Sequence, residues 1–85
     1  LVQPQSYNEG SFAVQIGSFQ DRKNAEALAE RMKLEYGVAS IQIFDRGDAV
    51  FFRVQVADVG TIGQAMKLQS DLERIGFKDC FVIAR

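Results

Sequence analysis

Histidine and paired cysteines are absent from the sequence. There is no histidine, and Cys80 is the one cysteine. Histidine is the commonest general base and metal ligand in proteins, and a single cysteine can form neither an internal disulfide nor a cysteine-based metal site. We therefore expect no metal, no cofactor and no catalytic residue, and we predict that this domain is not an enzyme.

An excess of positive charge is absent as well. The chain has 10 Lys and Arg against 11 Asp and Glu, which gives a formal net charge of −1. Proteins that bind nucleic acid gain affinity by neutralising phosphates with a basic surface, so we expect no nucleic acid partner. No apolar run reaches the length of a transmembrane helix, and no signal-peptide pattern opens the chain. We also expect no direct membrane insertion of this domain.

Proline is rare, and its position divides the chain. The one proline lies in the N-terminal stretch LVQPQSYNEG together with several turn-forming residues. This composition predicts a linker over residues 1–10 and a domain over residues 11–85. A chain of 85 residues suffices for one hydrophobic core. We interpret it as a monomeric module cut from a longer protein.

Alternation and helical spacing predict six elements. Apolar and polar residues alternate in FAVQI, whereas residues 21–36 place apolar side chains at helical spacing between Asp21 and Gly37, which suit the two helix ends. Similar signals, including a turn at residues 45–48 and a Thr61/Gln64 capping pair, predict the other elements. The predicted strands are residues 12–16, 38–44, 50–56 and 80–84, and the predicted helices are residues 21–36 and 63–75. The order βαββαβ predicts an α+β, ferredoxin-like fold, in which two helices cover one face of a four-stranded antiparallel sheet.

The other face of the sheet is left open, and alternation along the strands assigns residues to it. If the larger apolar sets of the first three strands form the core, the open face receives Ala13, Gln15, Ser40, Gln42, Phe44, Phe51, Arg53 and Gln55. Both sides of the fourth strand are apolar, and we assign Cys80, Val82 and Ala84 to the core and Phe81 and Ile83 to the open face.

This combination of side chains allows two interpretations. Aromatic rings beside amides suit a sugar chain, because the C–H faces of pyranose rings stack on aromatic side chains and the hydroxyl and acetamido groups need donors and acceptors. Arg53 adds a planar fork for a carboxylate. The same residues also suit an ordinary solvated surface, because single exposed apolar side chains are common. Alternation alone does not choose between a binding site and a wet surface.

Four stretches occur in an order shared with a known family: FAVQIGSF at residues 12–19, NAEALA in the first helix, FRVQV at residues 52–56, and Gly76 with Phe77 before the last strand. Over about residues 11–85 this series resembles the SPOR domain. SPOR domains are peptidoglycan-binding modules of bacterial division and cell-wall-remodelling proteins, and they recognise glycan strands lacking stem peptides at the division septum. The resemblance implies a location in the periplasm or cell envelope, and a parent protein such as a lytic transglycosylase or an amidase. The family frequently has Gly-Pro after the third strand, where this chain has Ala57-Asp58-Val59-Gly60.

The resemblance also implies roles for individual residues. Gln15 and Ser18 match the family's VQxGSF segment, and Arg53 matches the Arg of its third-strand motif. Phe19 matches as well, but we expect it to cap the core. Loss of the stem peptide frees the lactyl carboxylate of N-acetylmuramic acid, with which Arg53 would pair. Alternation and resemblance together give seven candidate glycan-binding residues: Gln15, Ser18, Phe44, Phe51, Arg53, Gln55 and Phe81.

Three other functions are compatible with a ferredoxin-like fold. An RNA-binding module needs a basic, glycine-containing aromatic run on the third strand, which VFFRV lacks. An acylphosphatase-like enzyme needs an anion cradle and an Arg in the first loop, where GSFQD has an acid. A protein–protein interaction or regulatory domain, paired through the apolar part of the open face, stays open. The tripeptide RGD at residues 46–48 is interpreted as an ordinary hairpin turn.

Overall fold

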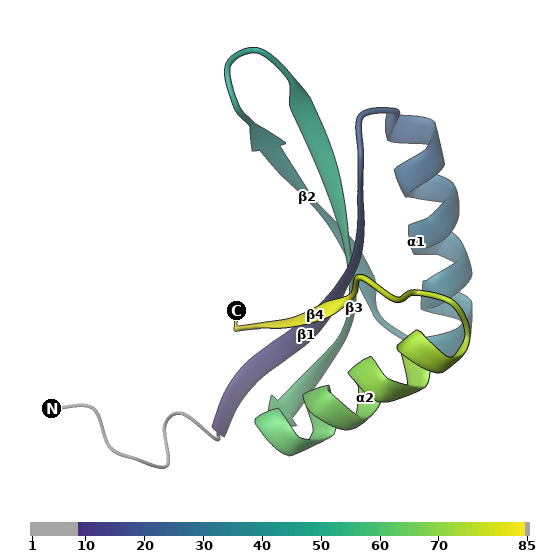
Figure 1. Cartoon of the computed structure of the whole chain (residues 1–85), viewed down its shortest axis with the longest axis vertical. Helices are drawn as coiled ribbons and strands as arrows, with labels where there is room; N and C mark the ends of the chain where they lie inside the picture. The colour runs from purple at the N-terminus through teal and green to yellow at the C-terminus, as the bar shows by residue number, and fades with distance from the viewer. Residues whose placement is uncertain (1–8, 85) are drawn as a thin grey trace, which may run out of the picture.

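The computed structural model describes residues 9–84, which form four strands and two helices (Figure 1). The strands are β1 (Glu9–Phe19), β2 (Ala39–Asp45), β3 (Val50–Thr61) and β4 (Phe81–Ala84), and the helices are α1 (Arg22–Tyr36) and α2 (Ile62–Arg74). Glu9 and Gly10 begin β1, and the rest of the predicted linker lies outside the described residues. Neither helix within residues 9–84 is long and apolar enough to cross a membrane.

The four strands form one antiparallel sheet in the order β2-β3-β1-β4. Both helices lie on the same side of this sheet, and the β2–β3 hairpin extends away from them (Figure 1). Helix α1 connects β1 to β2, and α2 connects β3 to β4. Each helix therefore packs against the sheet that contains the strands it connects. The predicted α+β, ferredoxin-like arrangement is confirmed.

Both ends of α1 carry the predicted residues. The Asp21 side chain accepts a hydrogen bond from the backbone N–H of Lys23 at 2.9 Å, which satisfies one of the free donors of the first turn. The helix stops at Gly37, whose φ of 85° suits glycine, and whose N–H donates to the carbonyl of Lys33 at 2.9 Å. These local bonds explain why the helix has the length that its sequence predicts.

The ends of α2 follow the same logic with a different C-terminal motif. The Thr61 hydroxyl accepts from the backbone N–H of Gln64 at 3.2 Å, so the predicted N-terminal cap is confirmed. Past the last turn, Gly76 has a φ of 120°, and the N–H of Phe77 donates back to the carbonyl of Leu72 at 3.0 Å. This six-to-one bond is that of a Schellman motif, which directs the chain toward β4.

The hydrophobic core lies between the sheet and the helices. Burying a large apolar side chain completely contributes about 1.5–3 kcal/mol. Strands β1 and β3 and both helices supply the largest of the completely buried side chains: Val14, Met32, Val54, Val56 and Leu72. Cys80, directly before β4, is buried in this core, and Val82 of β4 packs against it. The prediction that these two residues face inward is therefore confirmed. Ala84 was assigned inward as well, and this was wrong, because at the end of β4 it is exposed and borders a hollow of the open face.

Strands β1 and β3 pair through bulges that the alternation pattern does not include. Gln15 pairs with Gln55, but Gly17 pairs with Val54, so Ile16 and Gly17 together oppose a single residue. The extra residue reverses the alternation in the last part of β1. Ser18 consequently pairs with Arg53, which has open-face parity, and Phe19 packs against the core as expected.

A further irregularity lies in β3 at Ala57. Ala57 adopts a φ of 70°, a left-handed conformation that costs about 1–2 kcal/mol for a residue with a Cβ. Its N–H donates to the carbonyl of Val38 at 2.7 Å. The strand then continues to Thr61, past the predicted end at residue 56, because pairing with β1 resumes at Val59.

Candidate functional site

Strand pairing arranges the open-face side chains in rows across the sheet. Two residues along a strand separate one row from the next, which is a step of about 7 Å. The Phe44–Phe51 pair lies nearest the hairpin tip, the next row holds Gln42, Arg53 and Ser18, and the third holds Ser40, Gln55, Gln15 and Phe81. The register thus brings all seven predicted site residues onto one continuous face.

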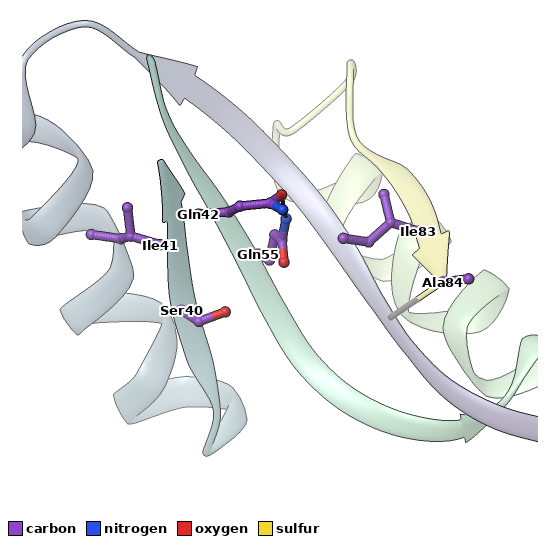
Figure 2. A pocket seen from close by; sticks show the side chains of 6 residues that line it. All are labelled: Ser40, Ile41, Gln42, Gln55, Ile83 and Ala84. Carbon is purple, nitrogen blue, oxygen red and sulfur yellow. Dashed lines mark hydrogen bonds between the residues drawn. The ribbon is translucent and has the colours of Figure 1, made fainter. Parts of the chain in front are cut away.

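The central amides on this face are more enclosed than alternation suggested. Gln15 is 9 % exposed and Gln55 is 5 % exposed. Gln15 lies on β1 and Gln55 on β3, and these are the two inner strands of the sheet. Each amide is therefore flanked on both sides by side chains of neighbouring strands. The Gln55 Nε2 donates to the Gln42 Oε1 at 2.8 Å, which fixes the orientation of both amides (Figure 2). These amides form the floor of the face, and only groups at its surface are free to meet a ligand.

A hollow of about 310 Å³ opens beside this amide pair (Figure 2). It is bordered by residues from β2, β3 and β4, namely Ser40, Ile41, Gln42, Gln55, Ile83 and Ala84. We call it the amide hollow. Its border on β2 and β3 is polar apart from Ile41, its border on β4 is apolar, and none of these residues is charged.

Toward the hairpin tip, two guanidinium groups lie over two aromatic rings. The Arg53 Cζ is 4.0 Å from the centre of the Phe44 ring, and the Arg46 Cζ is 5.7 Å from the centre of the Phe51 ring. Cation–π contacts of this kind contribute about 0.5–1 kcal/mol at exposed sites. Together with Ser18, these four residues border a second hollow, of about 280 Å³, which we call the arginine hollow.

The two arginines of this hollow differ in their electrostatic partners. Arg46 lies 3.8 Å from the Asp48 carboxylate, which partly compensates its charge. The ion pairs found among residues 9–84 do not include Arg53. Arg53 is partly exposed as a residue, and its guanidinium keeps most of its hydrogen-bonding capacity for a ligand; a carboxylate is the group with which a guanidinium pairs best.

Phe81 provides the most exposed aromatic ring of the face, at 48 %. It lies on β4, opposite Gln15. Several residues bordering the hollows were outside the predicted set of seven. Alternation placed Ser40, Gln42 and Ile83 on the open face without selecting them, and Arg46 had been interpreted as part of a turn. The contact between Arg46 and the Phe51 ring depends on the conformation of the β2–β3 turn, which the spacing of residues in the sequence does not predict.

The single cysteine lies away from this face. Burial raises the pKa of the Cys80 thiol, and the nearby carboxylates of Glu73 and Asp79 act in the same direction. Its Sγ lies 3.6 Å from the carbonyl oxygen of Gln69 and donates to it. A neutral, enclosed thiol is a poor nucleophile. Within residues 9–84 no cluster of acidic or cysteine side chains could hold a metal ion.

Comparison with known proteins identifies the family of this chain. The family model of the SPOR domain matches residues 8–84, which is nearly the whole chain. No curated protein and no solved structure matches the chain. SPOR domains bind peptidoglycan and are associated with bacterial cell division and the cell wall. With essentially its full length matched by that model, the chain belongs to the SPOR domain family.

Proposed function

We propose that this chain is a non-catalytic module that binds peptidoglycan glycan strands lacking stem peptides, through the open face of its sheet. Family membership supports peptidoglycan as the ligand. The finer proposal rests on Arg53, which lies against the Phe44 ring toward the hairpin tip and is absent from the ion pairs of the described residues. We further propose that the module acts in the periplasm or cell envelope, at the division septum.

Selection against stem peptides would follow from charge. The stem peptide is joined to the lactyl group of N-acetylmuramic acid by an amide bond, and its removal leaves a free carboxylate. Arg53 offers planar N–H groups that match a carboxylate, and the Phe44 contact reduces the side-chain freedom lost on binding. A stem peptide removes the negative charge and adds bulk against the sheet, so discrimination combines lost attraction with repulsion.

The neighbouring candidates would support the sugar on either side of Arg53. Ser18 lies directly opposite Arg53 and can share a sugar hydroxyl or the carboxylate with it. Phe81 offers an exposed ring face for the apolar side of a pyranose. Phe44 and Phe51 act mainly by holding Arg53 and Arg46, because a guanidinium already lies over each ring. Gln15 and Gln55 contribute through the few amide atoms that reach the surface of the floor.

Co-sedimentation with purified sacculi tests this proposal. One half of the preparation is treated with an amidase that removes stem peptides, and the other half is left untreated. The wild-type chain is expected to sediment with the treated sacculi and much less with the untreated ones. Arg53→Ala should weaken binding to treated sacculi by roughly 10- to 100-fold, since hydrogen bonds to charged groups contribute about 1.5–3 kcal/mol. Arg53→Lys should fall between the two, because it keeps the charge without the planar fork.

A matched control is Arg31→Ala, which removes an equal charge from an exposed position of α1, away from the open face. It should bind as the wild type does, and the thermal midpoint of Arg53→Ala should stay close to that of the wild type. Equal binding to both kinds of sacculi would contradict the proposed selection against stem peptides. Absence of binding to either kind would contradict the function itself.

A further inference from the structure

The two hollows of the open face are neighbours with different chemistry. The arginine hollow is bordered by two guanidinium groups, whereas the amide hollow has only neutral residues around it. Arg53 borders the first and Gln55 the second, and they lie two residues apart on β3. Side chains with this spacing point to the same face about 7 Å apart. A ligand that extends past Arg53 along β3 therefore meets the amide hollow next.

Hydrogen bonding within the amide pair determines what the hollow can offer a ligand. The bond from Gln55 Nε2 to Gln42 Oε1 uses a donor of Gln55 and the acceptor of Gln42. This leaves the Nε2 donors of Gln42 and the Oε1 acceptor of Gln55. In Figure 2 the Gln55 oxygen points away from the Gln42 amide. The amide pair thus offers a ligand both donors and an acceptor, and a secondary amide needs one of each.

The rest of the amide hollow fits the remainder of such a group. Ile83 and Ala84 border the hollow from β4, on the side opposite Ser40 and Gln42 (Figure 2). These apolar side chains can contact a methyl group, while the Ser40 hydroxyl adds one further donor and acceptor. A methyl group, a carbonyl and an N–H on one small unit are the features of an acetamido group.

We propose that the amide hollow is a second subsite, which binds the acetamido group of the sugar next to the one whose carboxylate pairs with Arg53. This subsite rests on the proposed glycan-binding function and adds a requirement to it. A glycan strand can occupy both hollows at once only when its free carboxylate and a neighbouring N-acetyl group follow each other in the right order along β3. The subsite thus sets the register in which the strand binds.

Oligosaccharides that lack the carboxylate isolate the amide hollow. The uniformly ¹⁵N-labelled chain is titrated with the tetramer of β-1,4-linked N-acetylglucosamine and, in parallel, with the tetramer of β-1,4-linked glucose, which has no acetamido groups. The acetamido tetramer is expected to shift the backbone amide signals of Ser40, Gln55 and Ile83, and the glucose tetramer is expected to leave them unchanged.

Gln42→Glu is the informative variant for the same titration. A carboxylate at this position keeps an acceptor for Gln55 Nε2 but removes the donors that face the ligand. Binding of the acetamido tetramer should become about tenfold weaker, as expected when about one hydrogen bond is lost and a partner is left unpaired. Gln64→Glu makes the same chemical change at an exposed position of α2 and should leave binding unchanged.

The outcomes separate this inference from the function on which it rests. Equal responses to the two tetramers, or Gln42→Glu binding as well as the wild type, would overturn the subsite even if amidase-treated sacculi are still bound through Arg53. Conversely, acetamido-specific shifts without binding to treated sacculi would support the chemistry of the hollow and contradict the proposed function.

Discussion

The contact between Gly17 and the Phe19 ring allows a quantitative test of the β1 bulge. A Cβ added at Gly17 would lie 2.9 Å from Cε2 and 3.0 Å from Cζ of Phe19. Carbon atoms in van der Waals contact are about 3.5–4.0 Å apart, so Gly17→Ala must displace the ring by roughly 0.5–1 Å. Phe19 packs against the core and pairs with Phe52, which limits where the ring can go.

The expected cost combines two opposing effects. Forcing an extra carbon into a packed region costs about 1–3 kcal/mol. Gly17 does not have a positive φ, so alanine also restricts the unfolded chain and stabilises the folded one by about 0.4–1 kcal/mol. The two ranges leave a net loss between about 0 and 2.6 kcal/mol for Gly17→Ala, centred near about 1.3 kcal/mol. Urea unfolding followed by circular dichroism measures it, and with a slope of about 1 kcal/mol per molar the midpoint should fall by about 1.3 M.

A double-mutant cycle with Phe19→Leu tests the cause. Leucine has no atoms at the positions of Cε2 and Cζ, so the clash disappears in that background. Gly17→Ala should then be neutral or slightly stabilising, and the coupling between the two changes should be about 1 kcal/mol or more. If the cost of Gly17→Ala is the same in both backgrounds within about 0.5 kcal/mol, which is the usual limit of additivity, contact with the Phe19 ring is not the reason for glycine at this position.

Two further predictions concern the C-terminal end of α1 and the buried thiol. Gly37 has a φ of 85°, and Gly37→Ala should lower the free energy of unfolding by about 1 kcal/mol, because a Cβ disfavours a left-handed backbone. Gly63 has no positive φ and open space around it, so Gly63→Ala is the matched control and should not lower the stability of the protein in the same urea titration. Burial raises the Cys80 pKa, so the folded state favours the neutral thiol more than the unfolded state does. The stability that results is fully present below the pKa of the unfolded state, and it is lost as the pH rises through the pKa of the folded state. The free energy of unfolding should therefore fall more steeply in the alkaline range for the wild type than for Cys80→Ala, and parallel pH profiles would contradict this.

The order of the elements and the ends of the helices could be predicted because their signals are local. The caps at Asp21 and Thr61 and the stop at Gly37 each act within one turn of their own helix. The ends of β1 and β3 could not be predicted in the same way. Their pairing past residue 56 depends on the bulge at Ala57, whose N–H bonds to Val38 on a distant part of the chain.

The candidate site shows the same division between local and long-range information. Alternation assigned Arg53 and Gln55 to the open face, and the register confirms that assignment. It could not predict how enclosed Gln55 is, because that depends on which strands lie on either side of β3. Alternation also places Ser18, three residues after Gln15, on the helix-covered face. The bulge at Ile16 and Gly17 reverses this assignment, and only the resemblance to a family pointed to Ser18.

The aromatic residues require the largest change of interpretation. From the sequence, Phe44 and Phe51 suggested bare rings on which sugars would stack. In the folded chain a guanidinium lies over each ring, 4.0 Å away for Phe44 and 5.7 Å for Phe51. The rings then hold positive charge at the surface, and under the proposed function a bound sugar would meet the charge before it met the ring. Recognition at this end of the face should consequently depend on an anionic group and weaken with salt, whereas binding at the neutral amide hollow should be nearly independent of ionic strength.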